Sequence, residues 1–465
     1  MATGKKNFFE REVKSFLPNE TIHEMARETG FMQRQGKIKM SDFFWNQVLG
    51  FDSGTHRSIN QFRISYEAKT GTTLSRSSFY ERFDDELVVF LKKVLKHLCK
   101  CNMKGRGKLK KKLKRFQELV ISDTTVIKLH DLLEKVFPSV RKGKGRGKVK
   151  SSAKIHYSTG INDIAPSSVV VTSETVRDIT KLKIDKGIRN KLLLFDRAYY
   201  GYKVFQKISQ NKGYFISRIK EPNKFIITKD NLAGDMKDDE DSPVGMTLNE
   251  ALYWLRRDVF DVEVTLGINT KSKSRGQIPR KRLLKFLKTG NVPPHIKIFR
   301  LRVVCIWNSK KGRYDRYITN ILDPEELNAH DIAEVYSYRW EVEMIFKELK
   351  SYYHIDELST RKKCVVEALI YSALISLVVC RMLLYGLSQY FGVSQSDIPR
   401  RLFTAFFAYA SRIIHVLISV NSLKEIWQNL ETALLHNVIE PYSKRRDARR
   451  ERMYGSSLHS VDKFL

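Results

Sequence analysis

Short apolar stretches bounded by polar residues follow one another between residues 117 and 220 and predict strands. The strand candidates are 118–129, 153–160, 167–173, 191–196 and 213–220. Apolar residues at helical spacing predict helices over 174–182 and 202–210. Consecutive strands, followed by strands that alternate with a helix, predict a mixed sheet with helices on its faces.

The pattern changes on both sides of this region. Residues 1–100 read as helical, and residues 221–322 contain alternating strands at 295–307 and 313–322. A long helix is predicted to begin near Pro324, and the chain after Leu358 reads as helical to about residue 435. The most apolar stretch, 368–380, is too short to span a bilayer and predicts a buried core helix rather than a membrane span.

These changes in the pattern of apolar and polar residues predict an α/β core with a β-rich insertion, flanked by helical regions at both ends. The expected segments are a helical N-terminal region (1–115), the first part of the core (116–220), the insertion (221–322), a long helix (323–358), here called the signature helix, and a helical C-terminal region (359–465). The last segment ends in a basic arm, 443–453.

Within the N-terminal region, two short helical segments flank a turn that contains Gly71. Segments 58–69 and 74–83 are typical of a helix-turn-helix, which places its second helix in the major groove of DNA. The residues that would face DNA are Arg76, Ser77, Ser78, Tyr80 and Arg82. An ordinary helical pair with a polar outer face is the alternative.

Charge gives the first indication of a partner. The 465 residues include 84 Lys and Arg against 51 Asp and Glu, a formal net charge of +33. A polyanion would relieve the resulting self-repulsion, and DNA or RNA is the obvious candidate. Two basic runs, 104–115 and 141–150, could contact phosphates or could simply be solvated. The five cysteines lack metal-binding spacing, and no secretory signal is evident, so a cytoplasmic protein is expected.

Two aspartates stand at informative positions. Asp123 and Asp196 each follow an apolar, strand-like run. A carboxylate at such a place is costly unless it is paired or binds a metal, although Asp123 could instead begin a turn. If the two strands are neighbours, both acids lie at one end of the sheet, where a third acid would complete a site for two Mg²⁺ ions.

The predicted signature helix supplies the third acid. Its residues Tyr336, Arg339, Glu343, Lys347 and Lys350 fall on one face of the helix. An apolar stripe lies beside them. The face could be a solvated surface with a Glu343–Lys347 pair, or it could present a carboxylate, an aromatic ring and cations to DNA.

The spacing Tyr336-x₂-Arg339-x₃-Glu343-x₆-Lys350 resembles the Tyr-Arg-Glu-Lys signature of the insertion sequence 4 family of DDE transposases from bacteria and archaea. The segments that begin with Asp123 and Asp196 look like the first and second Asp motifs of that family. The resemblance covers roughly residues 115–355.

The resemblance implies an RNase H-like fold in which Asp123, Asp196 and Glu343 are catalytic and hold two Mg²⁺ ions, with Mn²⁺ as a substitute. It implies that Tyr336, Arg339 and Lys350 grip double-stranded DNA at the transposon terminal inverted repeat. Lys347 and, more weakly, Arg218 are candidates for the same work. Further implications are cut-and-paste transposition into target DNA, a prokaryotic cytoplasm and a synaptic homodimer. The helical C-terminal region (359–465) is the expected site of dimerisation.

Some members of the family stack a flipped base on a Trp that precedes the signature helix. Trp307 lies too early in this chain for that position, which leaves Tyr314 or Tyr317 as substitutes.

Two other functions fit part of the pattern. An RNase H-like nuclease or resolvase without strand transfer would share the three acids but would not need the Tyr-Arg-Lys grip. A non-catalytic DNA-binding regulator derived from a transposase would not need intact acids. Strand transfer separates the first from a transposase, and the three acids count against the second.

Overall fold

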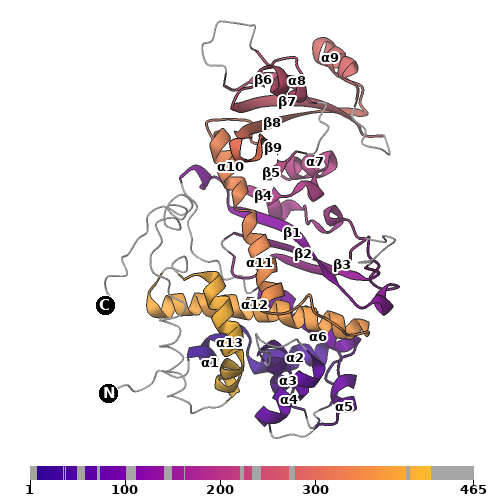
Figure 1. Ribbon diagram of the computed structural model, residues 1–465, viewed down its shortest axis with the longest axis vertical. Coiled ribbons are helices and arrows are strands. Elements are labelled where there is room, and N and C mark those ends of the chain that lie inside the picture. The colour runs from indigo at the N-terminus through magenta and orange to yellow at the C-terminus, as the bar shows by residue number, and fades with distance from the viewer. Residues whose placement is uncertain are drawn as a thin grey trace. The chain divides into compact units, whose positions relative to one another are not determined.

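The computed structural model (Figure 1) divides the chain into two compact units. Unit one comprises residues 1–110, 124–177 and 342–465, and unit two comprises 111–123 and 178–341. The structure describes residues 8–419 apart from 35, 37, 50–57, 71–73, 101–110, 141–148, 162, 220–224, 233–241, 272–277 and 394–397.

Unit two is built on a mixed sheet. Its strands lie in the order β1-β4-β5-β9-β8-β7-β6. The first three, β1 (Glu118–Lys128), β4 (Lys191–Phe195) and β5 (Tyr214–Arg218), are parallel. The others pair antiparallel: β6 (Ile226–Asp230), β7 (Val259–Asn269), β8 (Ile296–Asn308) and β9 (Arg313–Thr319).

Helices cover this sheet and close its core. They are α7 (Tyr202–Gln210), α8 (Leu248–Trp254), α9 (Arg280–Thr289) and α10 (Ala329–Ser337). Stacked aromatic rings fill the space under α7, where Phe205 and Phe215 lie 4.3 Å apart and nearly parallel. A second apolar cluster lies under α9 and includes Ile278, Leu283 and Phe286. The apolar faces of these helices therefore fix them to the sheet.

Unit one is largely helical. Its N-terminal helices are α1 (Phe8–Phe16), α2 (Asn19–Glu28), α3 (Met40–Leu49), α4 (Ile59–Thr70), α5 (Arg76–Glu81) and α6 (Asp85–Lys100). Its C-terminal helices are α12 (Lys363–Phe391) and α13 (Arg400–Ser419), and α12 packs against α1, α3, α6 and α13. Strands β2 (Ser152–Gly160) and β3 (Ser168–Ser173) form an antiparallel pair.

The apolar segment 368–380 lies inside α12, which is longer than the sequence predicted. Alone among the described helices, α12 is long and apolar enough to cross a membrane. Its most apolar window is 94% buried within the protein, which confirms the prediction of a core helix.

Two local predictions were wrong. Residues 174–182 form no α-helix but a single 3₁₀ turn at Asp178–Lys181. Ile179 and Leu182 are only partly buried against the core, and this limited packing does not stabilise a longer helix. The signature helix is broken into α10 and α11 (Trp340–Ser351) by a turn at residues 338–339. Most of both basic runs and the basic arm lie outside the described residues.

Candidate active site

The two aspartates meet at the edge of the parallel strands in unit two. Strands β1 and β4 pair with Ser122 opposite Phe195, so the next residues, Asp123 and Asp196, are neighbours across the pair. Adjacent strands lie about 4.8 Å apart, and residues in register point to the same face of the sheet. Strand β1 continues to Lys128, so Asp123 lies within a strand and does not begin a turn. The predicted pairing of the two strands that lead into these acids is confirmed.

A cation from α10's C-terminal turn engages the first of these acids. Arg339 Nη1 donates a hydrogen bond of 2.8 Å to Asp123 Oδ2, and both side chains are largely buried. The turn that carries Arg339 is tight, because the amide of Arg339 donates to the carbonyl of Tyr336 at 3.1 Å. The break between the helices therefore aims the guanidinium at the aspartate.

Tyr336 lies at the centre of an aromatic and cationic cluster. The guanidinium carbons of Arg218 and Arg339 lie 5.6 and 5.8 Å from the centre of its ring. The ring of Tyr317 lies 5.2 Å away, tilted by 57°. Cations over an aromatic face are attracted by its negative quadrupole. Three predicted DNA-contacting residues, Arg218, Tyr336 and Arg339, are thus brought together.

The tyrosines beside the aspartates are kept neutral. Burial, with a smaller contribution from the charge of Asp196, raises the pKa of Tyr336 to about 12, although Arg339 and Arg218 oppose this. Burial also raises the pKa of Tyr199, and the charges of Asp178, Asp123 and Asp196 add to the rise. At neutral pH both hydroxyl groups keep their protons and can donate hydrogen bonds.

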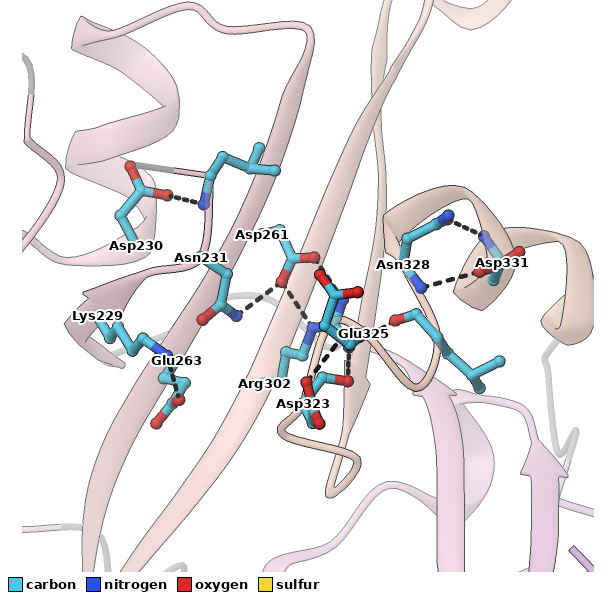
Figure 2. A network of polar contacts seen from close by, with 12 residues as sticks. Lys229, Asp230, Asn231, Asp261, Glu263, Arg302, Asp323, Glu325, Asn328 and Asp331 are labelled. Carbon is cyan, nitrogen blue, oxygen red and sulfur yellow. Dashed lines mark hydrogen bonds and ion pairs between the residues drawn. The ribbon is translucent and has the colours of Figure 1, made fainter. Parts of the chain in front are cut away.

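A buried polar network, which sequence reasoning missed, holds the start of α10 (Figure 2). Arg302 is fully buried and pairs with Asp261, whose carboxylate also accepts a 3.0 Å bond from Asn231. The same guanidinium donates to the backbone carbonyls of Asp323 at 3.2 Å and Leu327 at 2.7 Å. The loop before α10 is therefore tied to strands β7 and β8.

A reciprocal cap completes this attachment. The side chain of Asn328 accepts from the amide of Asp331 at 2.9 Å, and the side chain of Asp331 accepts from the amide of Asn328 at 3.0 Å. This capping box fixes where α10 begins. Helix α10 in turn packs against β5, β7 and β8, so the position of Tyr336 is set by the network at the other end of its helix.

The remaining signature residues lie on α11. Glu343 and Lys350 are half-buried and Lys347 is exposed. These three belong to unit one, whereas Tyr336 and Arg339 belong to unit two. The prediction of one continuous helix through all five residues was wrong, because α10 ends at Ser337 and α11 begins at Trp340.

A family model described as "Transposase DDE domain" matches residues 114–379, which is more than half of the chain. The chain belongs to the DDE transposase family. The matched span contains Asp123, Asp196 and Glu343.

Individual relatives of this DDE-family protein share less than a quarter of its residues in the aligned regions. The chain is 22% identical over 399 residues to the transposase for insertion sequence element IS1151 of Clostridium perfringens, covering 82% of this chain and 81% of that one. It is 24% identical over 400 residues to the transposase for IS231E of Bacillus thuringiensis subsp. finitimus, covering 83% and 81%. The synaptic complex of piggyBac transposase with hairpin DNA aligns with a TM-score of 0.43 and 11% identity, over 95% of this chain and 88% of that chain.

Helix α11 of the DDE-family protein is oriented by an acid that sequence reasoning missed. Glu348 is buried and pairs with Arg381 of α12, and it also accepts a 3.4 Å bond from Thr404 of α13. Phe346 packs edge-on against Tyr157 of β2 at 6.2 Å. Glu343 lies about 140° around the helix from Glu348, so this anchor turns Glu343 away from the helical core of unit one.

The oxygen donors suit a hard divalent ion. Asp123 and Asp196 offer carboxylates on one face of the sheet, and Asp196 is not engaged as a helix cap. The guanidinium of Arg339 already provides one of them with a cationic partner. Over the part of the chain that the structure describes, no three His, Cys, Asp or Glu side chains gather closely enough to hold a metal ion. Because Mg²⁺ prefers carboxylate oxygens, Asp123 and Asp196 could supply two of its ligands, and a third would have to come from elsewhere.

The remaining sequence predictions concern the helix-turn-helix and the two tyrosines considered for base stacking. Helices α4 and α5 form the predicted pair, and the polar residues of α5 proposed to read DNA are exposed. Tyr317 is 6% exposed and packs on Tyr336, while Tyr314 donates a 2.7 Å bond to the carbonyl of Arg257. Both rings already have protein partners, which counts against either as the acceptor of a flipped base.

Proposed function

We propose that this protein is a cut-and-paste DNA transposase of the insertion-sequence type. The observation that carries the proposal is the register of β1 and β4, which makes Asp123 and Asp196 neighbours. The match to the DDE family and the similarity to insertion-sequence transposases support it. We further propose an RNase H-like core and membership of the insertion sequence 4 group, on the spacing of Tyr336, Arg339, Glu343 and Lys350.

Asp123, Asp196 and Glu343 are the proposed ligands of two Mg²⁺ ions, which Mn²⁺ can replace. When bound, such ions supply Lewis acids that activate water and stabilise the leaving oxygen of a phosphodiester. All three donors are carboxylates, which Mg²⁺ prefers. Glu343 would join the two aspartates when DNA is in place.

The cations have a separate task at the transposon end. Arg339 offers a planar fork that binds two phosphate oxygens, and Lys347 and Lys350 add point charges on the next helix. The neutral hydroxyl of Tyr336 donates a hydrogen bond to a phosphate oxygen. Arg218 also lies near the ring of Tyr336, with its guanidinium carbon 5.6 Å from the ring centre. Together these groups would hold the scissile phosphate in line with its attacker.

The reaction then has two stages. Water attacks the phosphodiester at the transposon end, the P–O bond to the 3′ oxygen breaks, and a free 3′-OH and a 5′-phosphate result. The 3′-OH later attacks a phosphodiester of target DNA, and the displaced target oxygen leaves as a new 3′-OH. Two ends must be joined, so we propose a synaptic homodimer that forms on DNA in a prokaryotic cytoplasm.

The test uses labelled DNA that carries a terminal inverted repeat. Asp123→Ala, Asp196→Ala and Glu343→Ala should each abolish cleavage and leave binding of the DNA end nearly unchanged. Glu357→Ala serves as a control on an acid outside the site. Cleavage by any of the three variants refutes that residue's assignment, and cleavage without joining to target DNA indicates a nuclease instead.

A further inference from the structure

An exposed pair of aromatic rings lies on the β-rich part of unit two, away from the signature residues in the sequence. Tyr253 is 65% exposed and Trp254 is 71% exposed at the end of α8. Their rings contact each other edge to face at 5.0 Å. Large aromatic side chains this open to solvent are unfavourable unless a partner covers them.

A conformationally strained cationic residue lies just beyond the C-cap of α8, which is Leu255. Arg256 is exposed and has a φ of 45°, in the left-handed region. Helices commonly end in this conformation, but glycine adopts it at much lower cost because it lacks a Cβ. The chain therefore places an exposed arginine two residues after Trp254, at a position where glycine would be more stable.

A basic helix is attached to α8. Arg280, the first residue of α9, bonds both carboxylate oxygens of Glu250 on α8 at 3.3 and 3.2 Å and the carbonyl of Gly245 at 2.5 Å. Lys281, Lys285 and Lys288 are exposed and spaced four and three residues apart, so they share one face of α9. Figure 1 shows α8 and α9 beside each other at one end of the sheet.

The charge selects the class of partner. A second copy of the same cationic surface would repel this one, and the cost would rise as water is excluded. A polyanion is attracted instead. The phosphates of duplex DNA can pair with the lysines. Its bases, however, are stacked inside the duplex and cannot cover the exposed rings of Tyr253 and Trp254. Unpaired nucleotides satisfy both features, since their phosphates meet the cations and their bases stack on the rings.

We propose that Tyr253, Trp254, Arg256 and the lysine face of α9, here called the α8/α9 surface, bind single-stranded DNA. The inference rests on the proposed function, because transposition opens DNA ends and exposes unpaired bases. The rings would stack on one or two bases, and Arg256, Lys281, Lys285 and Lys288 would follow the backbone.

The test places 5-iodouracil in a single-stranded oligonucleotide of arbitrary sequence and irradiates it with the full-length protein in EDTA. Cross-links should map to the peptide that contains Tyr253 and Trp254, and the same sequence as a duplex should give few. Cross-links elsewhere only, or equal yields from the duplex, would overturn the proposal. The probe has no terminal repeat and no metal is present, so the outcome is independent of whether the protein cleaves DNA.

Variants measure the contribution of each group by fluorescence anisotropy. Loss of one base–aromatic stack weakens binding by roughly 5- to 150-fold, so Trp254→Ala should lose single-strand affinity within this range and change duplex affinity less than twofold. Tyr409→Ala, which removes a ring that is 74% exposed on α13, is the matched control and should change neither. Equal losses for single strand and duplex, or a change in oligomeric state alone, would contradict the proposal.

Arg256→Gly separates binding from folding. Because glycine relieves the left-handed strain, this variant should melt at the same or a higher temperature while it loses affinity for the single strand. Unchanged affinity would show that Arg256 does not contribute to the α8/α9 surface, and a lower melting temperature would contradict the inference that its backbone is strained.

Discussion

Replacement of Arg339 by Ala should tighten the binding of a divalent metal to the DNA-free protein while it lowers DNA cleavage. In the structure, Arg339 competes for Asp123 through a 2.8 Å bond between side chains that are 15% and 18% exposed. Hydrogen bonds to charged groups contribute about 1.5–3 kcal/mol, and partial exposure favours the lower value. If the metal no longer has to displace an interaction of about 1.5 kcal/mol between Arg339 and Asp123, its Kd falls roughly tenfold.

The assay is a titration with Mn²⁺ followed by electron paramagnetic resonance, which counts free ions without any need for turnover. Arg218→Ala is the matched control, because it removes the same charge from the ring of Tyr336 but its ion-pair partner, at 3.7 Å, is Asp315. We expect this control to change the Kd less than threefold. An Arg339→Ala protein that binds Mn²⁺ no more tightly than the control would refute the idea that Arg339 and the metal share Asp123.

Arg302→Met should destabilise unit two by about 3–5 kcal/mol in urea unfolding, because it leaves the buried carboxylate of Asp261 unpaired. The double variant Arg302→Met/Asp261→Leu should be more stable than Arg302→Met alone, and a less stable double variant would contradict this reasoning. Gly267→Ala should cost about 1–3 kcal/mol, since its Cβ would collide with Ile278, and an unchanged unfolding midpoint would argue against that packing. Since the pKa of Tyr336 is about 12, the loss of end binding in Tyr336→Phe should be equal at pH 7.5 and 9.5, where an ordinary tyrosine would be about a quarter ionised. A loss that shrinks at pH 9.5 would mean that the hydroxyl ionises.

The strands of the sheet could be predicted because their apolar runs are short and are interrupted by turn residues. The same runs identified Asp123 and Asp196, since an acid directly after a buried strand needs a partner. Register could not be read from the sequence. That Ser122 pairs with Phe195 depends on tertiary packing, and this pairing is what makes the two acids neighbours.

The break in the signature helix was missed because no Pro or Gly marks it. Residues 338–339 turn although the local pattern favours a helix, and the side chain of Arg339 is held by Asp123. The buried pairs Arg302–Asp261 and Glu348–Arg381 were also missed, because each joins residues far apart in the chain. A charge within an apolar strand or an amphipathic helix was the available signal, but it does not name the partner.

The proposed chemistry requires that Asp123, Asp196 and Glu343 bind the same pair of metal ions. Anomalous X-ray diffraction from Mn²⁺, in a crystal of the protein with a transposon end, would locate these ions. We predict two Mn²⁺ peaks about 3.5–4 Å apart, with oxygen ligands from all three carboxylates. A DNA-bound complex whose Mn²⁺ ions touch neither aspartate, or leave Glu343 outside the coordination sphere, would contradict it.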